Sequence, residues 1–338
     1  MALAALGTEI MKMIASFWFS LLLALASGHI TGPALAQSNY PDKPIRIIVG
    51  FSAGVAPDVT SRLLGDKFNE TWAKGVVVEN VTGAGGNIAV ERVAKAAPDG
   101  YTLLMGGNAA LVINPNLFAK LPYDPVKDFA YITQVFSVPN LLVVPADSPA
   151  KNIRELIALA KAKPDYLIAG HAGIGTSQHL GVELFKKMAG VQMQQVPYRG
   201  SPAVLPDLLG GRLNIFFGNI SNVLPLVREG KLRAFGITSK KRSPQIPELP
   251  TMEELGFPGF EATAWFGLMA PAGTPQPILD KLYQETAKVL AQPDVRSKLE
   301  SLGLQLVGNS PAEFAAIIKT ETPAWGKVIK DAGITAAQ

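Results

Sequence analysis

The chain has no cysteine among its 338 residues, and it is poor in histidine and in charged side chains. Without cysteine there can be no disulfide bond, no thiol chemistry and no lipid attached to an N-terminal cysteine. Only His171 and His179 follow residue 36, and no His-Glu-x-x-His motif occurs, so we expect no metal site. Charged residues make up 17% and hydrophobic residues 48%. This composition excludes a disordered chain and indicates about two packed domains.

Signatures of nucleotide and nucleic-acid binding are also missing. The net charge is only +4, and the longest basic run is residues 240–242, too short for a nucleic-acid surface. The glycines at 83 and 85 would need a small residue at position 88 to complete a dinucleotide-binding motif, but the chain has Ile88 there. No Gly-Lys-Ser/Thr follows a glycine loop. We therefore expect no cofactor and no nucleic-acid partner.

The apolar run near the N-terminus is too short to cross a membrane. It extends from Met13 to Ala26 after Lys12 and leads to Ala34-Leu35-Ala36, a small-x-small cleavage site. A spanning helix needs roughly 20 apolar residues, whereas a secretory signal combines a shorter run with such a site. We predict a signal peptide over residues 1–36 and a periplasmic mature chain that begins at Gln37.

From residue 45 onward, short β-branched runs alternate with amphipathic stretches. This alternation is typical of βα units and predicts an α/β fold with mainly parallel sheets. The expected strands are Ile45 to Phe51, Val76 to Val81, Thr102 to Gly106, Leu141 to Val144, Tyr166 to Ala169, Gln192 to Pro197, Leu213 to Phe217, Leu232 to Thr238 and Thr263 to Ala270.

Several helix starts can be predicted from capping residues. Ser148-Pro149 and Ser310-Pro311 each place a hydroxyl before a proline at the first helical position. Glu313 completes a capping box with Ser310, and Thr251 with Glu254 forms a second box. A further helix is expected over residues 277–290, where Ile278, Leu282, Val289 and Leu290 form one buried stripe.

Two proline-containing, loop-rich stretches, residues 108–129 and 243–259, interrupt the βα pattern. Each precedes an apolar strand, near residues 141–144 and 265–270, and we expect the chain to cross between two lobes at these strands. The prediction is a first lobe of residues 37–140 plus 262–338, a second lobe of residues 141–261, and a ligand cleft between them.

Three strand-to-helix loops are candidate binding sites because free N–H groups at helix N-termini favour anions. They are residues 52–58, residues 82–87 and residues 173–177, and each contains glycine. The alternatives are a plain tight turn for residues 82–87, a carboxylate that only stabilises a helix start for Asp58, and helix caps for Thr176 and Ser177. Recurrence in both expected lobes favours a binding role.

Other polar residues have two interpretations each. Ser177 beside His179 suggests a serine nucleophile and its base, but the Gly-x-Ser-x-Gly motif is incomplete. Arg199 can pair with a ligand carboxylate or with a surface acid. Asp207 can face solvent from a helix. Trp265 and Phe266 can stack on a ligand ring or serve as core residues.

The order of short motifs along the mature chain resembles the Bug family, the periplasmic substrate-binding receptors of tripartite tricarboxylate transporters. The motifs that carry the resemblance are Tyr40-Pro41-Asp42-Lys43-Pro44-Ile45, the loop ending in Asp58, Asn80 with Gly83-Ala84-Gly85-Gly86, Pro98-Asp99-Gly100-Tyr101-Thr102-Leu103, Gly175-Thr176-Ser177 with His179-Leu180, Pro197-Tyr198-Arg199-Gly200, Thr238-Ser239 with Arg242-Ser243-Pro244, and Pro250-Thr251 with residues 256–261.

This resemblance implies a two-lobed periplasmic binding protein of type II-like architecture. It also implies a small carboxylate as ligand and, as partners, the large and small subunits of a membrane permease; we expect a monomer that is not an enzyme. By resemblance, one carboxylate is held in the first lobe by Ser52, Ala53, Gly54, Asp58, Gly83, Ala84, Gly85, Gly86 and Asn87. The resemblance implies that the far end of the ligand is bound in the second lobe by Thr176, Ser177, His179, Tyr198, Gly200, Ser201, Asp207 and Asn219.

Two departures from the family pattern bear on the ligand. The first loop usually begins Pro-Pro-Gly-Gly, where this chain has Ser52-Ala53-Gly54-Val55. Acidic residues are common in the family where this chain has Asn214 and Gly218, which argues against a ligand with an ammonium group. A dicarboxylate, a tricarboxylate or an aromatic carboxylate remains. The alternative functions are a ligand-sensing partner of a signalling protein and an exported serine hydrolase.

Overall fold

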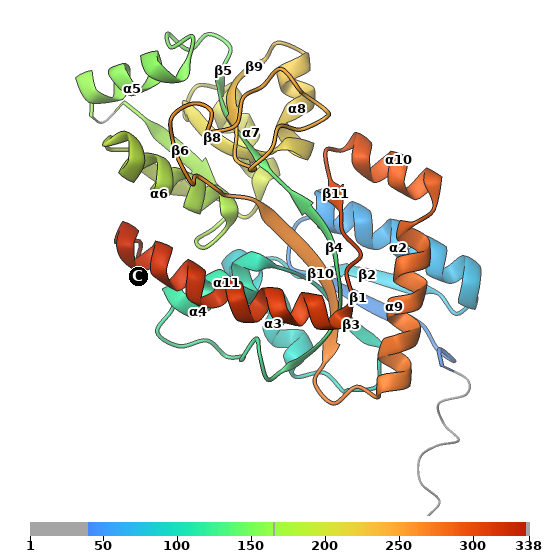
Figure 1. Ribbon diagram of the computed structural model, residues 1–338. Helices are drawn as coiled ribbons and strands as arrows, with labels where there is room; N and C mark the ends of the chain where they lie inside the picture. Colours follow the sequence, from blue (N-terminus) through green and yellow to red (C-terminus); the bar gives the residue numbers. More distant parts are fainter. Residues whose placement is uncertain (1–39, 165, 336–338) are drawn as a thin grey trace, which may run out of the picture. The chain divides into compact units, whose positions relative to one another are not determined.

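Two mixed β-sheets organise the protein in the computed structural model, which describes residues 40–164 and 166–335 (Figure 1). The first sheet has six strands in the order β11-β4-β10-β3-β1-β2, and the second has five in the order β7-β6-β8-β5-β9. The strands are β1 Ile45–Val49, β2 Val76–Asn80, β3 Thr102–Gly107, β4 Phe129–Val138, β5 Asn140–Pro145, β6 Ile168–His171, β7 Gln194–Pro197, β8 Ile215–Asn219, β9 Leu232–Ile237, β10 Ala264–Pro271 and β11 Gln305–Leu306.

Helices cover both faces of each sheet. On the first sheet, α2 and α9 pack on one face, while α3 and α11 pack on the other (Figure 1). On the second sheet, α5 and α6 share a core with Phe217, and α7 and α8 cover the opposite face. The helices are α2 Ala56–Trp72, α3 Asn87–Ala94, α4 Asn114–Leu117, α5 Ile153–Ala162, α6 Ser177–Ala189, α7 Ser201–Leu209, α8 Ile220–Arg228, α9 Gln276–Leu290, α10 Pro293–Ser301 and α11 Pro311–Ala332.

Local sequence explains where the clearest helices begin. The predicted capping box at Ser310 is confirmed, because the Ser310 hydroxyl accepts from the Glu313 N–H and the Glu313 carboxylate accepts from the Ser310 N–H. The predicted helix over residues 277–290 is confirmed as α9, with its apolar stripe buried. Such reciprocal caps satisfy backbone donors that the first turn leaves free.

Two other predicted helix starts are wrong. Helix α5 begins at Ile153 rather than after Ser148, because the Asn152 side chain accepts from the Glu155 N–H and takes the capping position. Thr251 and Glu254 do exchange the two hydrogen bonds of a capping box. They enclose only a turn, since Gly256, at φ +96°, lies two residues further on.

The expectation of mainly parallel sheets is also wrong. Strands β2, β1 and β3 are parallel, and so are β7, β6 and β8, but β4, β5, β9, β10 and β11 all enter antiparallel pairings. The antiparallel pairs occur where the chain changes sheet. A strand arriving from the other sheet is not held parallel by a right-handed crossover helix.

The largest segment whose secondary structure the sequence did not predict is residues 108–138. A π-helical segment, Ala109–Ile113, and α4 lie within the stretch predicted to be loop-rich. Strand β4, ten residues long and largely buried, follows. The chain changes sheet at Pro139, between β4 and β5, and it returns ahead of β10.

The first sheet takes its strands from residues 45–138 and 264–306, and the second from residues 140–237. Both sheets belong to one compact unit that begins at residue 41. The borders predicted for two lobes stay a prediction. The predicted signal peptide lies outside the described residues. Within the described ranges, no helix has both the length and the apolar character needed to span a membrane.

Candidate functional site

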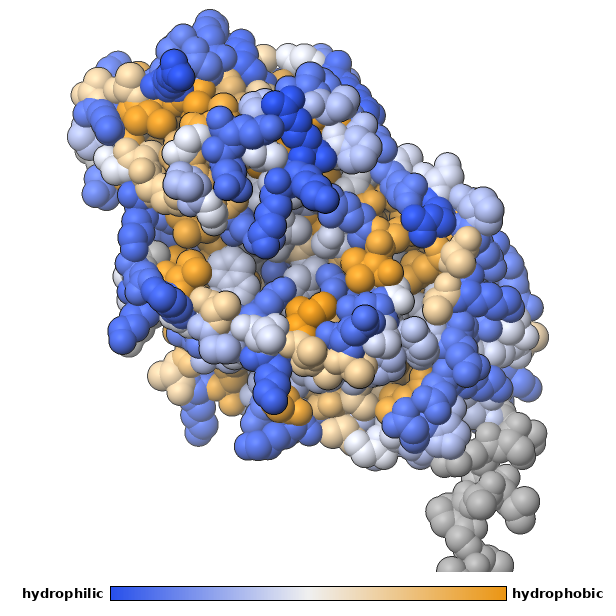
Figure 2. Space-filling model, viewed as in Figure 1, coloured by the Kyte–Doolittle hydropathy of each residue, from blue (hydrophilic) through white to orange (hydrophobic). Residues whose placement is uncertain are grey.

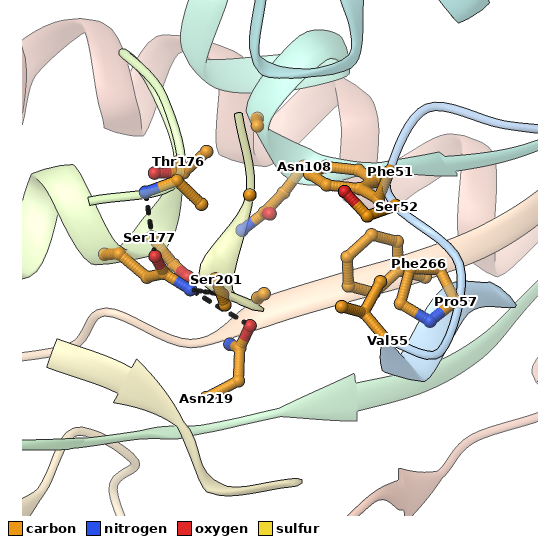
Figure 3. A pocket seen from close by; sticks show the side chains of 16 residues that line it. Phe51, Ser52, Val55, Pro57, Asn108, Thr176, Ser177, Ser201, Asn219 and Phe266 are labelled. Carbon is orange, nitrogen blue, oxygen red and sulfur yellow. Dashed lines mark hydrogen bonds between the residues drawn. The ribbon is translucent and has the colours of Figure 1, made fainter. Parts of the chain in front are cut away.

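A pocket lies where loops from the two sheets meet, and we call it the inner chamber (Figure 3). Its cavity is small in this arrangement, with a volume of about 40 Å³. The loops that follow β1, β3, β6, β7 and β8, together with the start of β10, supply its lining: Phe51, Ser52, Val55, Pro57, Gly107, Asn108, Ala109, Ala172, Thr176, Ser177, Gln178, Gly200, Ser201, Asn219, Ala264 and Phe266.

One wall of the inner chamber is a network of neutral polar side chains from the second sheet. The Gln178 amide donates to Ser201 Oγ at 2.5 Å and to Asn219 Oδ1 at 3.2 Å (Figure 3). Asn219 donates to Asn140 Oδ1 at 2.7 Å, and Asn140 donates to Ser177 Oγ at 3.1 Å. Each member fixes the next, so the wall presents oriented hydroxyl and amide groups without a net charge.

The opposite wall is apolar and comes from the first sheet. The rings of Phe51 and Phe266 meet edge to face with centroids 5.4 Å apart, and Phe136 stacks behind Phe266 at 5.1 Å. In Figure 3, Val55 and Pro57 lie beside Phe266, across the chamber from Ser177 and Asn219. This arrangement suits a ligand with a polar end and an apolar body.

Four helices begin at the inner chamber. Helix α2 begins after Val55, α6 after Thr176, α7 after Gly200 and α8 after Asn219, and all four of these preceding residues line the pocket. The first N–H groups of a helix have no intrahelical partner, and the helix dipole adds partial positive charge there. In α2 and α7 the second residue is a proline without an N–H, and in α8 the Ile220 N–H donates to the Pro139 carbonyl oxygen, so the dipoles and the remaining N–H groups are what favour an anion. A carboxylate can therefore be held in this chamber without a buried cation.

A second cavity, the outer chamber, adjoins the first and shares Phe51, Ala172 and Gly200 with it. Here the glycine loops of the two sheets touch. Gly85 has a φ of +64°, and a Cβ on it would lie 2.7 Å from the carbonyl oxygen of Ile174. The outer chamber is lined by residues 50–51, 82–86, 118, 172–174 and 197–200.

A family comparison gives this geometry a context. Residues 60–334 match the family described as the tripartite tricarboxylate transporter family receptor, TctC. The chain belongs to this receptor family. The match confirms the resemblance drawn from the sequence motifs.

Solved structures of several similar proteins have the same fold. The periplasmic binding protein BugD is 36% identical, with a TM-score of 0.83 over 88% of this chain and 99% of that one. Rpa4515 of R. palustris, solved with adipate, is 35% identical, with a TM-score of 0.84 over 88% and 99% of the two chains. MatC from Rhodopseudomonas palustris, solved with bound malate, is 34% identical, with a TM-score of 0.81 over 86% and 100%. The two-sheet architecture is thus that of periplasmic binding proteins.

In this TctC-family receptor the predicted residues fall into three places. Ser52, Thr176, Ser177, Gly200, Ser201 and Asn219 line the inner chamber. Gly83, Ala84, Gly85, Gly86 and Tyr198 line the outer chamber. Ala53, Gly54, Asp58, Asn87, His179 and Asp207 line neither.

Asp58 organises its own loop. Its buried carboxylate accepts from the Gly54 N–H at 2.8 Å, from Asn80 Nδ2 at 2.9 Å and from Arg62. Burial opposes ionisation, but the hydrogen bonds from Arg62, Gly54 and Asn80 outweigh it and lower the pKa of Asp58. Asp58 is therefore an ionised anchor that shapes residues 52–58, and its oxygens are already occupied.

Asn87 and Asp207 are similarly engaged elsewhere. Asn87 Oδ1 accepts from Asn114 Nδ2 and from the Tyr123 hydroxyl, both at 2.7 Å. Asp207 accepts from the Tyr198 hydroxyl at 2.6 Å and pairs with Arg212 at 3.0 Å. These contacts hold the loops around the chambers in place.

Ser177 and His179 do not form a nucleophile and base. Ser177 Oγ accepts from Asn140, while His179 Nδ1 accepts from the Gly175 N–H at 3.3 Å. Burial, with a smaller contribution from neighbouring His171, lowers the pKa of His179 to about 3, far too low for a general base at neutral pH. Across residues 40–164 and 166–335, no cluster of three or more His, Asp or Glu side chains could hold a metal ion.

The sequence left the roles of Trp265 and Phe266 undecided, and the structure places the two residues in the linings of different pockets. Phe266 lines the inner chamber, while Trp265, its neighbour on β10, lines a different hollow. Trp265 Nε1 donates to Glu321 of α11 at 2.8 Å. Figure 2 shows this hollow on the face that carries α11, with hydrophilic residues and separate apolar patches around it.

Sequence reasoning missed Gln178, Asn140, Asn108 and Phe51. Gln178 is the second residue of a helix whose capping residues were identified, so its position in the first turn was an available signal. Asn140 is the first residue of β5 and Asn108 follows β3, and the positions of these strands in the sheets could not be predicted. Asn214 and Gly218 line neither chamber, so their identity no longer argues against an ammonium ligand; the lack of acidic residues in the lining does.

Proposed function

We propose that this protein is a periplasmic receptor that captures a small carboxylate and delivers it to the large and small membrane subunits of a tripartite transporter. The observation that carries the proposal is the meeting of four helix N-termini from both sheets around a chamber without charged side chains. Such a site binds an anion through main-chain N–H groups and a dipole field.

The two ligand-bound relatives support the ligand class. The solved structure of Rpa4515 contains adipate and that of MatC contains malate, and both ligands are dicarboxylates. The apolar wall of Phe51 and Phe266 adds aromatic carboxylates to the candidates. We expect the two sheets, with their helices, to act as lobes of residues 37–140 plus 262–338 and of residues 141–261, which close on the ligand by a hinge motion.

Two contacts already join loops of the two sheets, and we expect both to persist when the lobes close. Ser52 Oγ donates to the carbonyl oxygen of Arg199 at 3.2 Å, and Gly85 lies against the carbonyl oxygen of Ile174, so loops from the two sheets already meet. A ligand that binds only the closed arrangement shifts the equilibrium toward it, and the permease can then recognise the closed form.

The test is a thermal-shift and calorimetric screen of purified protein against aliphatic dicarboxylates, citrate, aromatic carboxylates and amino acids. A ligand at a hundredfold excess over Kd stabilises the native state by about 2.7 kcal/mol, which a melting curve detects. Asn219→Asp places a negative charge in the inner chamber and should weaken carboxylate binding, whereas Asn214→Asp, outside both chambers, should not. If no carboxylate binds, or both variants bind as the parent does, the proposed site is wrong.

A further inference from the structure

Arg199 is the single charged residue among those that line the two chambers. It stands after the end of β7, just before helix α7, and its side chain is exposed. Within the described part of the chain, its guanidinium group forms no hydrogen bond, ion pair or ring contact. An arginine that lines a ligand cavity without a partner has all five N–H donors available.

The two acidic residues considered as partners for Arg199, Asp207 and Asp58, already bind other side chains. Asp207 on the same side uses both oxygens, one for Tyr198 and one for Arg212. Asp58 on the first sheet's side is held by Arg62. The interpretation of Arg199 as the partner of a surface acid therefore has no support within the described residues.

The backbone of Arg199 is fixed across the cleft. Its carbonyl oxygen accepts from Ser52 Oγ at 3.2 Å, and Gly200, with a φ of +117°, leaves room for that contact, since a Cβ there would lie 3.0 Å from Ser52 Oγ. The residue thus joins the first sheet's loop next to Gly200, which lines both chambers. Phe51 and Ala172 also line both chambers.

We propose that Arg199 binds a second carboxylate of the ligand, so that the receptor selects dicarboxylates over monocarboxylates. One carboxylate lies in the inner chamber at the helix N-termini, the apolar body passes Phe51, and the other carboxylate meets the guanidinium group in the outer chamber. This inference rests on the proposed function. Arginine suits the role because its planar donors match a carboxylate in a two-point contact.

The experiment compares acids that differ by one carboxylate. Calorimetry measures Kd for adipate against hexanoate and for terephthalate against benzoate, with the parent protein and with Arg199→Gln. The parent should prefer the diacid of at least one pair, and Arg199→Gln should reduce that preference by roughly 10-fold while leaving the monoacid unchanged. Arg199→Lys, which keeps the charge but loses the fork, should have an intermediate preference.

The matched control is Arg154→Gln. Arg154 is an exposed arginine on α5, lines neither chamber and has no partner among the described residues, so its loss should not alter any Kd. The inference fails if the parent binds diacid and monoacid equally, or if Arg199→Gln weakens both alike. It also fails if Arg199→Gln changes nothing. Absence of binding to every acid would refute the proposed function itself.

Discussion

Gly85→Ala tests whether contact between the glycine loops governs ligand affinity. Gly85 combines a φ of +64° with a position where a Cβ would lie 2.7 Å from the Ile174 carbonyl oxygen on the second sheet's side. Gly190, at the end of α6, has a φ of +63°, but a Cβ added there would have nothing within 4 Å. The two glycines share the backbone strain and differ in the inter-sheet contact, so Gly190→Ala is a matched control.

The magnitudes separate the two effects. A left-handed alanine costs about 1–2 kcal/mol, so both variants should lose a similar free energy of unfolding. In Gly85→Ala alone, overpacking against Ile174 should destabilise the closed arrangement by about 1–3 kcal/mol. A penalty of that size on the binding-competent state corresponds to a rise in Kd of roughly 5- to 150-fold.

The assay combines urea unfolding without ligand and calorimetry with the best acid from the screen. The expected result is equal loss of stability in both variants and a weaker Kd in Gly85→Ala only. Small-angle scattering should also show a smaller ligand-induced contraction for this variant. Equal affinity of Gly85→Ala and Gly190→Ala would refute the reasoning that the loops must touch when ligand is bound.

Three further predictions concern single groups. Ser52→Ala removes the hydrogen bond to the Arg199 carbonyl and should raise Kd by roughly 2- to 10-fold in calorimetry, with an unchanged melting temperature without ligand. Burial lowers the pKa of His179 from 6.5 to about 3, so the unfolded chain takes up the proton first and His179 should reduce the free energy of unfolding by about 2 kcal/mol between pH 7 and pH 5. Urea titrations should show a smaller loss in His179→Gln than in the parent, because His171, whose pKa burial also lowers, keeps its own contribution. Burial raises the pKa of Glu321, so its ionised form destabilises the fold; Glu321→Gln should gain stability over the parent as pH rises from 4 to 7, and a constant difference would contradict this.

How far the sequence predicts this protein depends on the range of the interactions involved. The capping box at Ser310 and the stripe of α9 depend on residues within one helix, and both were predicted correctly. Strand β4 was missed because its alternation is obscured by burial on both faces between β10 and β11. The mixed strand directions were missed because they depend on where the chain changes sheet, which local patterns do not encode.

In the candidate site, too, residues fixed by local sequence were predicted and residues fixed by long-range contacts were not. Ser177 could be named from its loop, since a helix N-terminus can be identified from nearby sequence, whereas Asn219 was named only through the family resemblance. The polar network through Asn140 could not, because it joins strands and helices far apart in the chain. Phe51 and Phe266 meet only when β1 and β10 take their places on either side of β3.

The helix N-termini around the inner chamber have a consequence for how such receptors diverge. Main-chain N–H groups belong to every residue except proline, so most substitutions would leave the proposed anion site in place. The side chains of the polar and aromatic walls are free to vary around it and to change the shape that the rest of the ligand must fit. A fold of this kind can acquire a new substrate by exchanging a few wall residues while it keeps the same means of holding an acid.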